Sequence, residues 1–210
     1  MKIAIIGAGN VGKALAGSFA RAGHEVTLSS AHPDTARAVA AEAGVKAAAG
    51  NREAASDADL IVLAVPYGAL ADVVDEVGDR LTGKVVIDAT NPLRPDHQGL
   101  AVEGTSAAEQ VQARAKGARV VKAFNSVLAA RQTDPTIDGT QLDGFVAGDD
   151  PEAKRVVLDL VRDIGLNPID AGPLEVARAL EALALLNIML QLRTNGSWQT
   201  GWKLVGPLTA

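Results

Sequence analysis

The stretch "KIAIIGAGNVG", residues 2–12, is an apolar run that ends in closely spaced glycines. Gly7, Gly9 and Gly12 have the G-x-G-x-x-G spacing, and apolar side chains recur at helical intervals after them. In a strand–turn–helix unit the first glycine permits a tight turn, the second lets the backbone approach a pyrophosphate, and the third lets helix and strand pack closely. Such glycines alone are weak evidence, but strand, helix and N-terminal position agree here. The stretch therefore predicts a dinucleotide-binding turn.

Short apolar runs alternate with helical patterns along the rest of the chain. The predicted strands are residues 2–7, 25–29, 60–66, 84–90, 119–124, 144–148 and 167–172. Runs without polar alternation are typical of strands buried on both faces of a parallel sheet. Ser106 with Glu109 forms a capping box, and Asp150 before Pro151 is an N-cap sequence, so a helix is expected after each. The fold class predicted is α/β, with a Rossmann-type, doubly wound, mostly parallel sheet.

The C-terminal part of the chain departs from this alternation. Residues 173–192 form a predicted helix that is apolar nearly all round, and the sequence after it is irregular and contains both tryptophans. A helix with so much apolar surface must be covered on more than one side, by its own domain or by a second subunit. We expect residues 1–210 to form a single NAD(P)-binding domain with residues 173–210 as a C-terminal helical cap, and we expect a homodimer.

Composition narrows the classes of partner. The net charge is −5 and the Lys and Arg residues are scattered, so no basic patch indicates nucleic-acid binding. The chain has no cysteine, and His24, His32 and His97 form no spaced cluster with carboxylates, so no metal site is expected. No apolar run has the length of a membrane span or a signal peptide. We expect a cytoplasmic protein that does not contact membranes.

The residues after the second predicted strand bear on the choice of dinucleotide. An NAD-binding site usually has Asp or Glu there, to bind the ribose 2′-hydroxyl. This chain has Ser29, Ser30, Ala31 and His32 instead. Serine hydroxyls can donate to a 2′-phosphate, and His32 or Arg37 could add positive charge, so NADP is favoured. The alternative is that the serines only cap the next helix, in a site that accepts either dinucleotide.

Further candidates follow the next strands. In open α/β sheets ligands lie outside the carboxyl ends of the strands. Two loops there should flank the nicotinamide and its ribose, and their candidate residues are Val65, Pro66, Asn91 and Leu93. The prolines could equally serve only to make these loops rigid. Asn125 ends a further strand, where it could bind the nicotinamide carboxamide or instead cap the helix that follows.

Taken together, these motifs resemble the NADPH-dependent reductases of the deazaflavin coenzyme F420 and the related cytosolic domain of the six-transmembrane metalloreductases. The resemblance covers nearly the whole chain. It rests on "IGAGNVGKALA" (6–16), "VLAVPYGAL" (62–70), "VVIDATNPL" (85–93), "GTSAAEQV" (104–111), "VVKAFNSV" (120–127), "FVAGDDPEAK" (145–154) and "GLNPIDAGPLEVARALEALALLNI" (165–188). The last three stretches are more specific than the glycine turn.

The resemblance implies a reaction and a set of site residues. It implies hydride exchange between NADPH and a flavin-like ring, which is F420 in one branch and FAD in the other. The contacts it implies for the dinucleotide are Ala8, Gly9, Asn10, Val11, Ser30, Val65, Ala69, Asn91, Leu93 and Ala129. The family often has Arg directly after the serine that matches Ser30, whereas this chain has Ala31. Because of that difference, weaker binding of the 2′-phosphate is expected.

Three functional hypotheses follow. The first is an NADPH–F420 oxidoreductase without catalytic side chains, because hydride passes directly between two stacked rings. The second is an NADPH-dependent flavin or ferric reductase that uses FAD or FMN. The third is a non-catalytic NADP(H)-sensing module. This hypothesis would be favoured if the side chain of Trp198 or Trp202 filled the slot beside the nicotinamide.

Arg94, Lys122 and Arg131 are candidates for binding the anionic F420 tail, with ordinary surface charges as the alternative.

Overall fold

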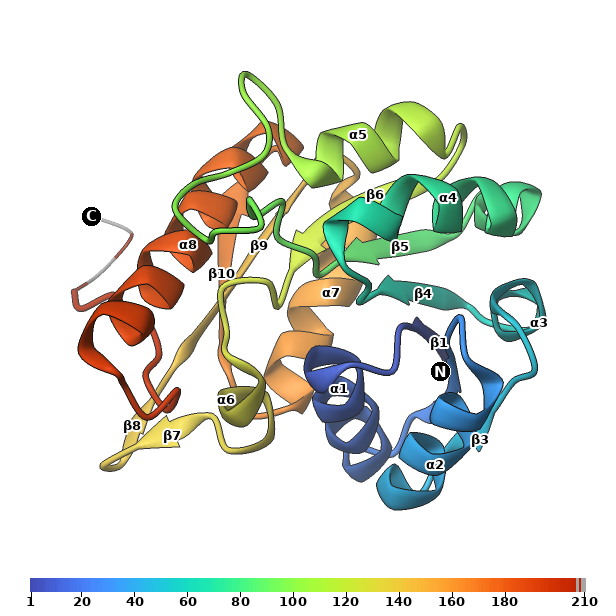
Figure 1. Cartoon of the computed structure of the whole chain (residues 1–210), viewed down its shortest axis with the longest axis horizontal. Helices are drawn as coiled ribbons and strands as arrows, with labels where there is room; N and C mark the ends of the chain where they lie inside the picture. Colours follow the sequence, from blue (N-terminus) through green and yellow to red (C-terminus); the bar gives the residue numbers. More distant parts are fainter. Residues whose placement is uncertain (207, 209–210) are drawn as a thin grey trace.

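An eight-stranded sheet runs through the centre of the computed structural model, which describes residues 1–206 and 208 (Figure 1). Its strands are β1 (Lys2–Ile6), β2 (Glu25–Ser29), β3 (Lys46–Ala47), β4 (Leu60–Leu63), β5 (Val85–Asp88), β6 (Arg119–Ala123), β9 (Asp143–Gly148) and β10 (Asn167–Gly172). Their order is β10-β9-β6-β5-β4-β1-β2-β3, and every neighbouring pair is parallel except β6 with β9. The predicted doubly wound, mostly parallel sheet and its seven strands are confirmed. A separate hairpin, β7 (Thr136–Ile137) and β8 (Thr140–Gln141), was not predicted.

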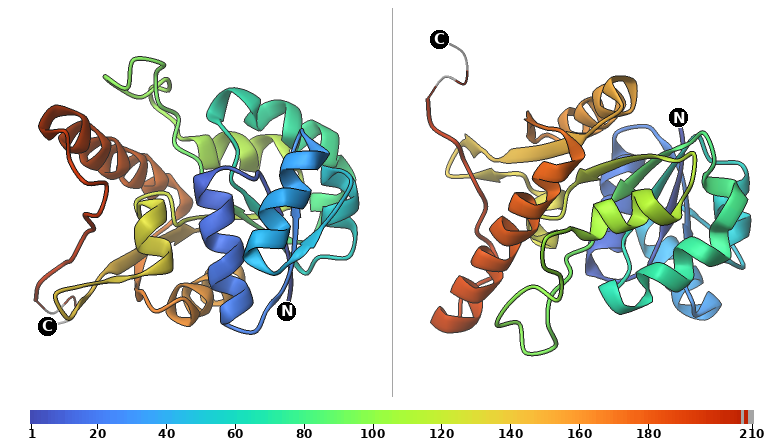
Figure 2. Two further views of the ribbon diagram at one scale, coloured as in Figure 1. Left: turned by 60° about the horizontal axis from the view of Figure 1, so that its bottom comes forward. Right: turned by 90° about the horizontal axis from the view of Figure 1, so that it is seen from above.

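Helices cover both faces of the sheet (Figure 2). One face carries α1 (Asn10–Arg21), α2 (Pro33–Ala43) and α7 (Pro151–Asp163), and the other carries α3 (Asn51–Ser56), α4 (Tyr67–Val77) and α5 (Ala107–Arg114). The remaining helical segments are the 3-10 turns Gly78–Leu81 and Leu174–Val176, the short α6 (Ala129–Thr133) and the long α8 (Ala177–Thr194). The sheet is therefore the middle of three layers.

The strands are apolar on both sides because each side meets a helical layer. In β1, Ile3 and Ile5 belong to the core under α1 and α7, while Ala4 and Ile6 belong to the core under α4 and α5. Successive side chains of a strand point to opposite faces, so an unbroken apolar run supplies both cores. This explains why the predicted strands showed no polar alternation.

Both predicted helix starts have the expected caps. The Ser106 hydroxyl accepts a hydrogen bond from the Glu109 backbone N–H at 3.1 Å. Helix α5 begins at Ala107, directly after Ser106. An Asp150 carboxylate oxygen accepts one from the Ala153 backbone N–H at 2.7 Å, with Pro151 as the first residue of α7. These short polar side chains satisfy N–H groups that the helix itself leaves without a partner.

The C-terminal helix is present as α8, but its sides differ from the expectation of an all-round apolar helix. Polar Glu181, Asn187 and Gln191 are buried against the domain, whereas Leu186 and Leu190 are 48% and 45% exposed. The reason is that the buried polar groups are hydrogen-bonded to partners in the core and in the C-terminal segment. The predicted extension reaches residue 210, but residues 207 and 209–210 lie outside the described part. Within the described part no helix is long and apolar enough to cross a membrane.

The turn between β1 and α1 depends on two glycines. Gly7 has φ +118°, and a Cβ atom there would lie 2.2 Å from the Ala64 carbonyl oxygen. The Gly7 backbone N–H donates to the Ser29 carbonyl at 2.8 Å, which ties the turn to the end of β2. A Cβ atom at Gly12 would lie 1.8 Å from the Gly7 carbonyl oxygen. Glycine at these positions lets α1 start directly at the sheet edge.

Gly12→Ala is expected to lower the free energy of unfolding by about 3 kcal/mol or more, because the new methyl group overlaps backbone atoms that cannot move independently. Urea denaturation followed by circular dichroism measures this loss. The matched control is Gly9→Ala, since no protein atom lies within 4 Å of a Cβ atom at Gly9. The control should cost less than about 1 kcal/mol. Equal stability of the two variants would contradict the steric explanation.

Candidate nucleotide-binding site

The N-terminus of α1 is open to a ligand. Gly9 is its N-cap residue, no side chain caps it, and its first turn has no acidic residue. The backbone N–H groups of a first helical turn lack intrahelical partners and carry partial positive charge. Together with the open space above Gly9, this arrangement suits the pyrophosphate of a dinucleotide.

A cavity of about 760 Å³ lies beside this turn. It runs between the β1–α1 turn, the residues after β2, residues 49–51 at the start of α3, and α4 with the loop before it, so four separate parts of the chain form it. Seven of the residues predicted from sequence line it, namely Gly7, Ala8, Gly9, Ser30, Val65, Pro66 and Ala69. The size and the apolar walls suit the adenosine half of a dinucleotide.

The two serines after β2 have different surroundings. Ser29 is fully buried and its hydroxyl donates to the Asn51 side-chain oxygen at 2.9 Å, so it does not face the cavity. Ser30 lines the cavity, and its hydroxyl donates to the His32 carbonyl at 2.7 Å. A hydroxyl can rotate toward another acceptor, so only Ser30 remains as a serine donor for a 2′-phosphate. Ser29 is the last residue of β2, whereas Ser30 lies just beyond the strand.

The charges around the cavity are few. His32 lines it, as do Asp72 and Glu76 from α4, while Arg37 forms an exposed ion pair with Asp34 instead. Of the lining residues only His32 can become cationic. A 2′-phosphate would therefore depend on hydroxyl, backbone and imidazole groups rather than on an arginine fork.

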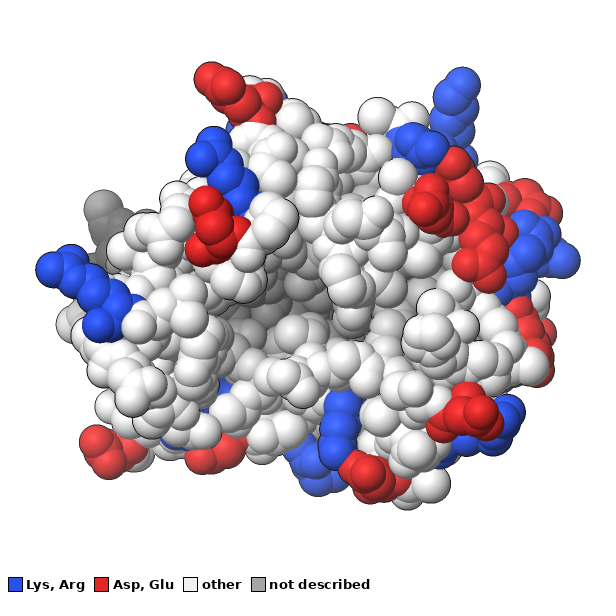
Figure 3. Space-filling view, in the orientation of Figure 1, with Lys and Arg blue, Asp and Glu red and all other residues white. Residues whose placement is uncertain are grey.

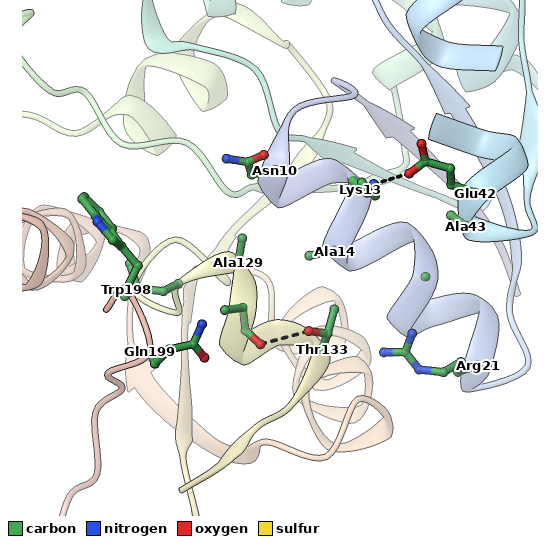
Figure 4. Close-up of a pocket in the computed structure, with 13 residues that line it drawn as sticks. Asn10, Lys13, Ala14, Arg21, Glu42, Ala43, Ala129, Thr133, Trp198 and Gln199 are labelled. Atoms are coloured by element: carbon green, nitrogen blue, oxygen red, sulfur yellow. Dashed lines mark hydrogen bonds and ion pairs between the residues drawn. The ribbon is translucent and has the colours of Figure 1, made fainter. Parts of the chain in front are cut away.

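Two other predicted residues lie on the opposite side of the glycine turn. Asn10 at the start of α1 and Ala129 at the start of α6 line a second cavity, shown in Figure 4. Trp198 from the C-terminal segment lines the same cavity. Val11 and Gly12 belong to the first turn of α1 and line neither of these two cavities.

Asn91 and Asn125 bind each other at the carboxyl ends of β5 and β6. The Asn91 amide donates to the Asn125 carbonyl at 2.9 Å, and the Asn125 amide donates to the Asn91 side-chain oxygen at 2.9 Å and to the Leu180 carbonyl at 3.0 Å. Asn125 does not cap the following helix, which has no side-chain cap. Its own side-chain oxygen has no partner among the described residues. Leu93 follows in a loop that pairs with Leu100.

One face of the molecule is hollowed. Figure 3 shows the hollow near the centre of the face, with walls formed by residues other than Lys, Arg, Asp and Glu. Neither Trp198 nor Trp202 lines the cavity that contains Pro66. The uncharged walls of the hollow suit flat aromatic rings.

Comparison with known proteins agrees with this geometry. The family model for NADP oxidoreductase, coenzyme F420-dependent, matches residues 2–92. An F420-dependent NADP reductase of Methanothermobacter thermautotrophicus is 35% identical over 212 residues, which span 92% of this chain and 90% of the relative. The chain belongs to the F420-dependent NADP oxidoreductase family.

Two further relatives extend this comparison. A crystal structure of a candidate F420-dependent NADP reductase from an Arthrobacter species matches with a TM-score of 0.89 and 31% identity, over 98% of this chain and all of the other. The metalloreductase STEAP3 of Rattus norvegicus is 30% identical over 188 residues, which span 88% of this chain but 36% of that protein. The family resemblance seen in the sequence, including its metalloreductase branch, is confirmed.

Beneath the asparagine pair, this family member buries three charged side chains that sequence analysis did not group. Lys122, Asp88 and Glu181 are all fully buried. The Lys122 ammonium donates to Asp88 at 2.8 Å, to Glu181 at 2.7 Å and to the Thr90 carbonyl at 2.6 Å. Lys122 is thus neither a surface charge nor a ligand for an F420 tail. The only sequence signal was an ionisable residue inside an apolar strand.

The cluster connects α8 to the residue before Asn91. Glu181 comes from α8 and also accepts the Ala107 backbone N–H at 3.0 Å, while its other oxygen has no partner among the described residues. Burial raises the pKa of the Glu181 carboxyl above its usual value, although the Lys122 charge acts in the opposite direction. Since Lys122 also binds the Thr90 carbonyl, this one ammonium joins α8 to the residue before Asn91.

Lys122→Met is expected to lower the free energy of unfolding by about 3–5 kcal/mol, because it leaves two buried carboxyl groups without their shared cation. Urea denaturation at pH 7 measures the loss. Arg155→Met on α7 is the control, since its exposed ion pairs should contribute less than about 1 kcal/mol. A loss no larger than that of the control would show that the cluster does not stabilise the fold.

Proposed function

We propose that this protein transfers hydride between NADPH and the deazaflavin coenzyme F420. The observation that carries the proposal is the open, uncapped N-terminus of α1 beside a cavity and an uncharged hollow, in a chain whose family members include F420-dependent NADP reductases. A nicotinamide supplies a hydride, and a deazaflavin ring accepts a hydride at a single carbon. The class is therefore an NADP-dependent oxidoreductase.

We propose that NADPH lies across the glycine turn. Its pyrophosphate is bound by the first turn of α1, its adenosine half occupies the cavity that contains Ser30, and its nicotinamide points toward the hollow seen in Figure 3. The residues that we assign to this binding are Gly7, Ala8, Gly9, Asn10, Val11, Gly12, Ser30, Val65, Pro66, Ala69, Asn91, Leu93, Asn125 and Ala129. Ser29 supports the site indirectly, through its hydrogen bond to Asn51.

The protein's part in the reaction is to position two rings. Hydride transfer between stacked rings requires no acid, base or nucleophile from the protein, because the cofactors carry the chemistry. Holding the reacting atoms at near-attack distance and excluding water supplies the acceleration. The hydrogen bonds among Asn91, Asn125 and Leu180 give the edge of the hollow the rigidity that such positioning needs.

A hydride-transfer assay on the purified chain tests this proposal. With NADPH as donor, oxidised F420 should lose its visible absorbance, while FMN and FAD should react at least about tenfold more slowly in kcat/KM, an energy difference of about 1.4 kcal/mol. NADPH should be preferred over NADH. Faster reduction of FMN or FAD would indicate the flavin-reductase alternative. Tight NADPH binding without turnover of any acceptor would leave the NADP(H)-sensing alternative.

We also propose one domain for the whole chain and a cytoplasmic location. β9 and β10 extend the same sheet that carries the glycine turn, and α8 reaches its core through Glu181, so the C-terminal part is joined to the rest by buried contacts. NADPH is a substrate of the cell interior, which supports the location.

We further propose that the protein is a homodimer formed through the outer face of α8. Leu186, Met189 and Leu190 are spaced as one stripe of a helix and are exposed, and with Leu192, Gln98 and Arg193 they line a shallow cavity of about 410 Å³. The buried side of α8 already packs within the domain, so the outward apolar stripe is available to a second copy. Helix stripes of this kind pack well against each other about a two-fold axis.

The double variant Leu186→Glu/Leu190→Glu is expected to be monomeric, because a dimer would bury four added carboxylates without partners. Size-exclusion chromatography with light scattering gives the molar mass. Val205→Glu is the control, since Val205 is 90% exposed and lies outside α8, and it should leave the dimer intact. A wild-type chain that is monomeric at micromolar concentration would disprove the dimer.

A further inference from the structure

A groove of about 610 Å³ runs along α1 on the side away from the adenosine cavity (Figure 4). One wall is α1, and the other is formed by α6 with Trp198 and Gln199 of the C-terminal segment. Asn10 and Ala129 line one end. Since we assign both residues to dinucleotide binding, the groove, here called the α1 groove, starts at the proposed dinucleotide site.

The far wall of the α1 groove is held in place by hydrogen bonds. The Trp198 backbone N–H donates to the Gln191 side-chain oxygen at 2.9 Å, and the Arg131 guanidinium donates to the Gln199 carbonyl at 2.7 Å. Arg131 also binds Asp134 and the Thr136 carbonyl, so its charge is committed to this wall. These hydrogen bonds therefore hold the C-terminal segment in a defined position as the far wall of the groove.

The cations in the groove come from α1. Lys13 and Arg21 line it together with one carboxylate, Glu42, which pairs with Lys13. The Arg21 guanidinium donates to the Ser18 hydroxyl at 2.9 Å, and no carboxylate of the described residues forms an ion pair with it. It lies over Gly17, where a Cβ atom would be 3.3 Å from its nitrogen. The groove thus carries one uncompensated positive charge in a chain of net charge −5.

The spacing of these cations matches an extended anionic chain. Lys13 is three positions after Asn10 in the helix, and Arg21 is eight positions after Lys13. These steps correspond to about 5 Å and about 12 Å along the helix axis. The Lys13–Glu42 pair is exposed, so exchanging its carboxylate for a phosphate costs little. An arginine without a carboxylate partner is well suited to a carboxylate or a phosphate, which it can bind through two parallel hydrogen bonds.

We propose that the α1 groove binds the anionic tail of the deazaflavin, with Lys13 at its phosphate and Arg21 at its terminal carboxylates. The inference rests on the proposed function. It names the site at which the protein would distinguish complete F420 from a deazaflavin that lacks the tail. F420 carries a ribityl chain, a phosphate and glutamate carboxylates beyond the ring, and α1 presents Asn10, Lys13 and Arg21 to the groove in that order along its axis. The other candidate cations do not line the groove, because Lys122 is buried and Arg94 donates to the Leu100 carbonyl.

The test compares F420 with the deazaflavin that lacks the phosphate and glutamates, at saturating NADPH. In the full chain carrying Lys13→Gln and Arg21→Gln, KM for F420 should rise about tenfold or more, because charge-assisted hydrogen bonds are lost. KM for the tail-less deazaflavin, KM for NADPH and kcat should stay unchanged. Wild-type preference for F420 over the tail-less ring should fall as salt is added. The control is Arg155→Gln/Arg162→Gln on α7, which removes the same charge elsewhere.

The outcomes are separable. An equal rise in KM for both deazaflavins, or a rise in KM for NADPH, would assign the groove to the ring or to the dinucleotide and overturn the inference. No change with either deazaflavin would reduce Lys13 and Arg21 to surface charges and overturn it as well. If the wild-type chain reduces neither deazaflavin, the proposed function fails first, and the tail site fails with it.

Discussion

The close approach of α1 to β1 is the constraint on which the site depends. Gly12 lies against the Gly7 carbonyl, where a Cβ atom would be 1.8 Å from the oxygen, so the helix begins at the sheet edge and not above it. This places the free N–H groups of the first turn over the strand ends, where the loops after β4 and β5 also arrive. Anion binding and ring positioning therefore share one origin, because a shifted helix would separate the pyrophosphate from both cavities.

A second constraint joins the C-terminal cap to this edge. Lys122 lies in the sheet and binds Asp88, Glu181 and the Thr90 carbonyl with its three donor hydrogens. Buried ions are costly unless they are paired and hydrogen-bonded, and this one ammonium meets that requirement with groups from the end of β5 and from α8. A movement of α8 would therefore shift Lys122 and the Thr90 carbonyl that it binds, directly before Asn91. The cap helix is part of the site's support, and its outer face is left for contacts beyond the domain.

The residues at the site show how far sequence reasoning reached. The glycine turn could be predicted because its spacing expresses a local steric need, and the strand ends could be predicted because an unbroken apolar run marks a buried parallel strand. Ser29 and Ser30 could not be told apart, because the direction of each side chain depends on the sheet register and on Asn51, which lies in another helix. Lys122 looked like a surface charge for the same reason, since its partners lie 34 and 59 residues away.

The sequence by itself determined the parallel sheet, the glycine turn, both capped helix starts and membership of the family, because each of these depends on local spacing or on whole stretches of residues. Tertiary structure alone decided which side of α8 is buried, because the partner of polar Glu181 is Lys122, which lies 59 residues away in the sequence. Tertiary structure alone also decided which cations are available to bind a ligand. The Arg131 guanidinium is hydrogen-bonded to the Gln199 carbonyl in the wall of the α1 groove, whereas Arg21 lines the open groove. Charge pairing depends on distances between segments that are remote along the chain, and only folding sets those distances.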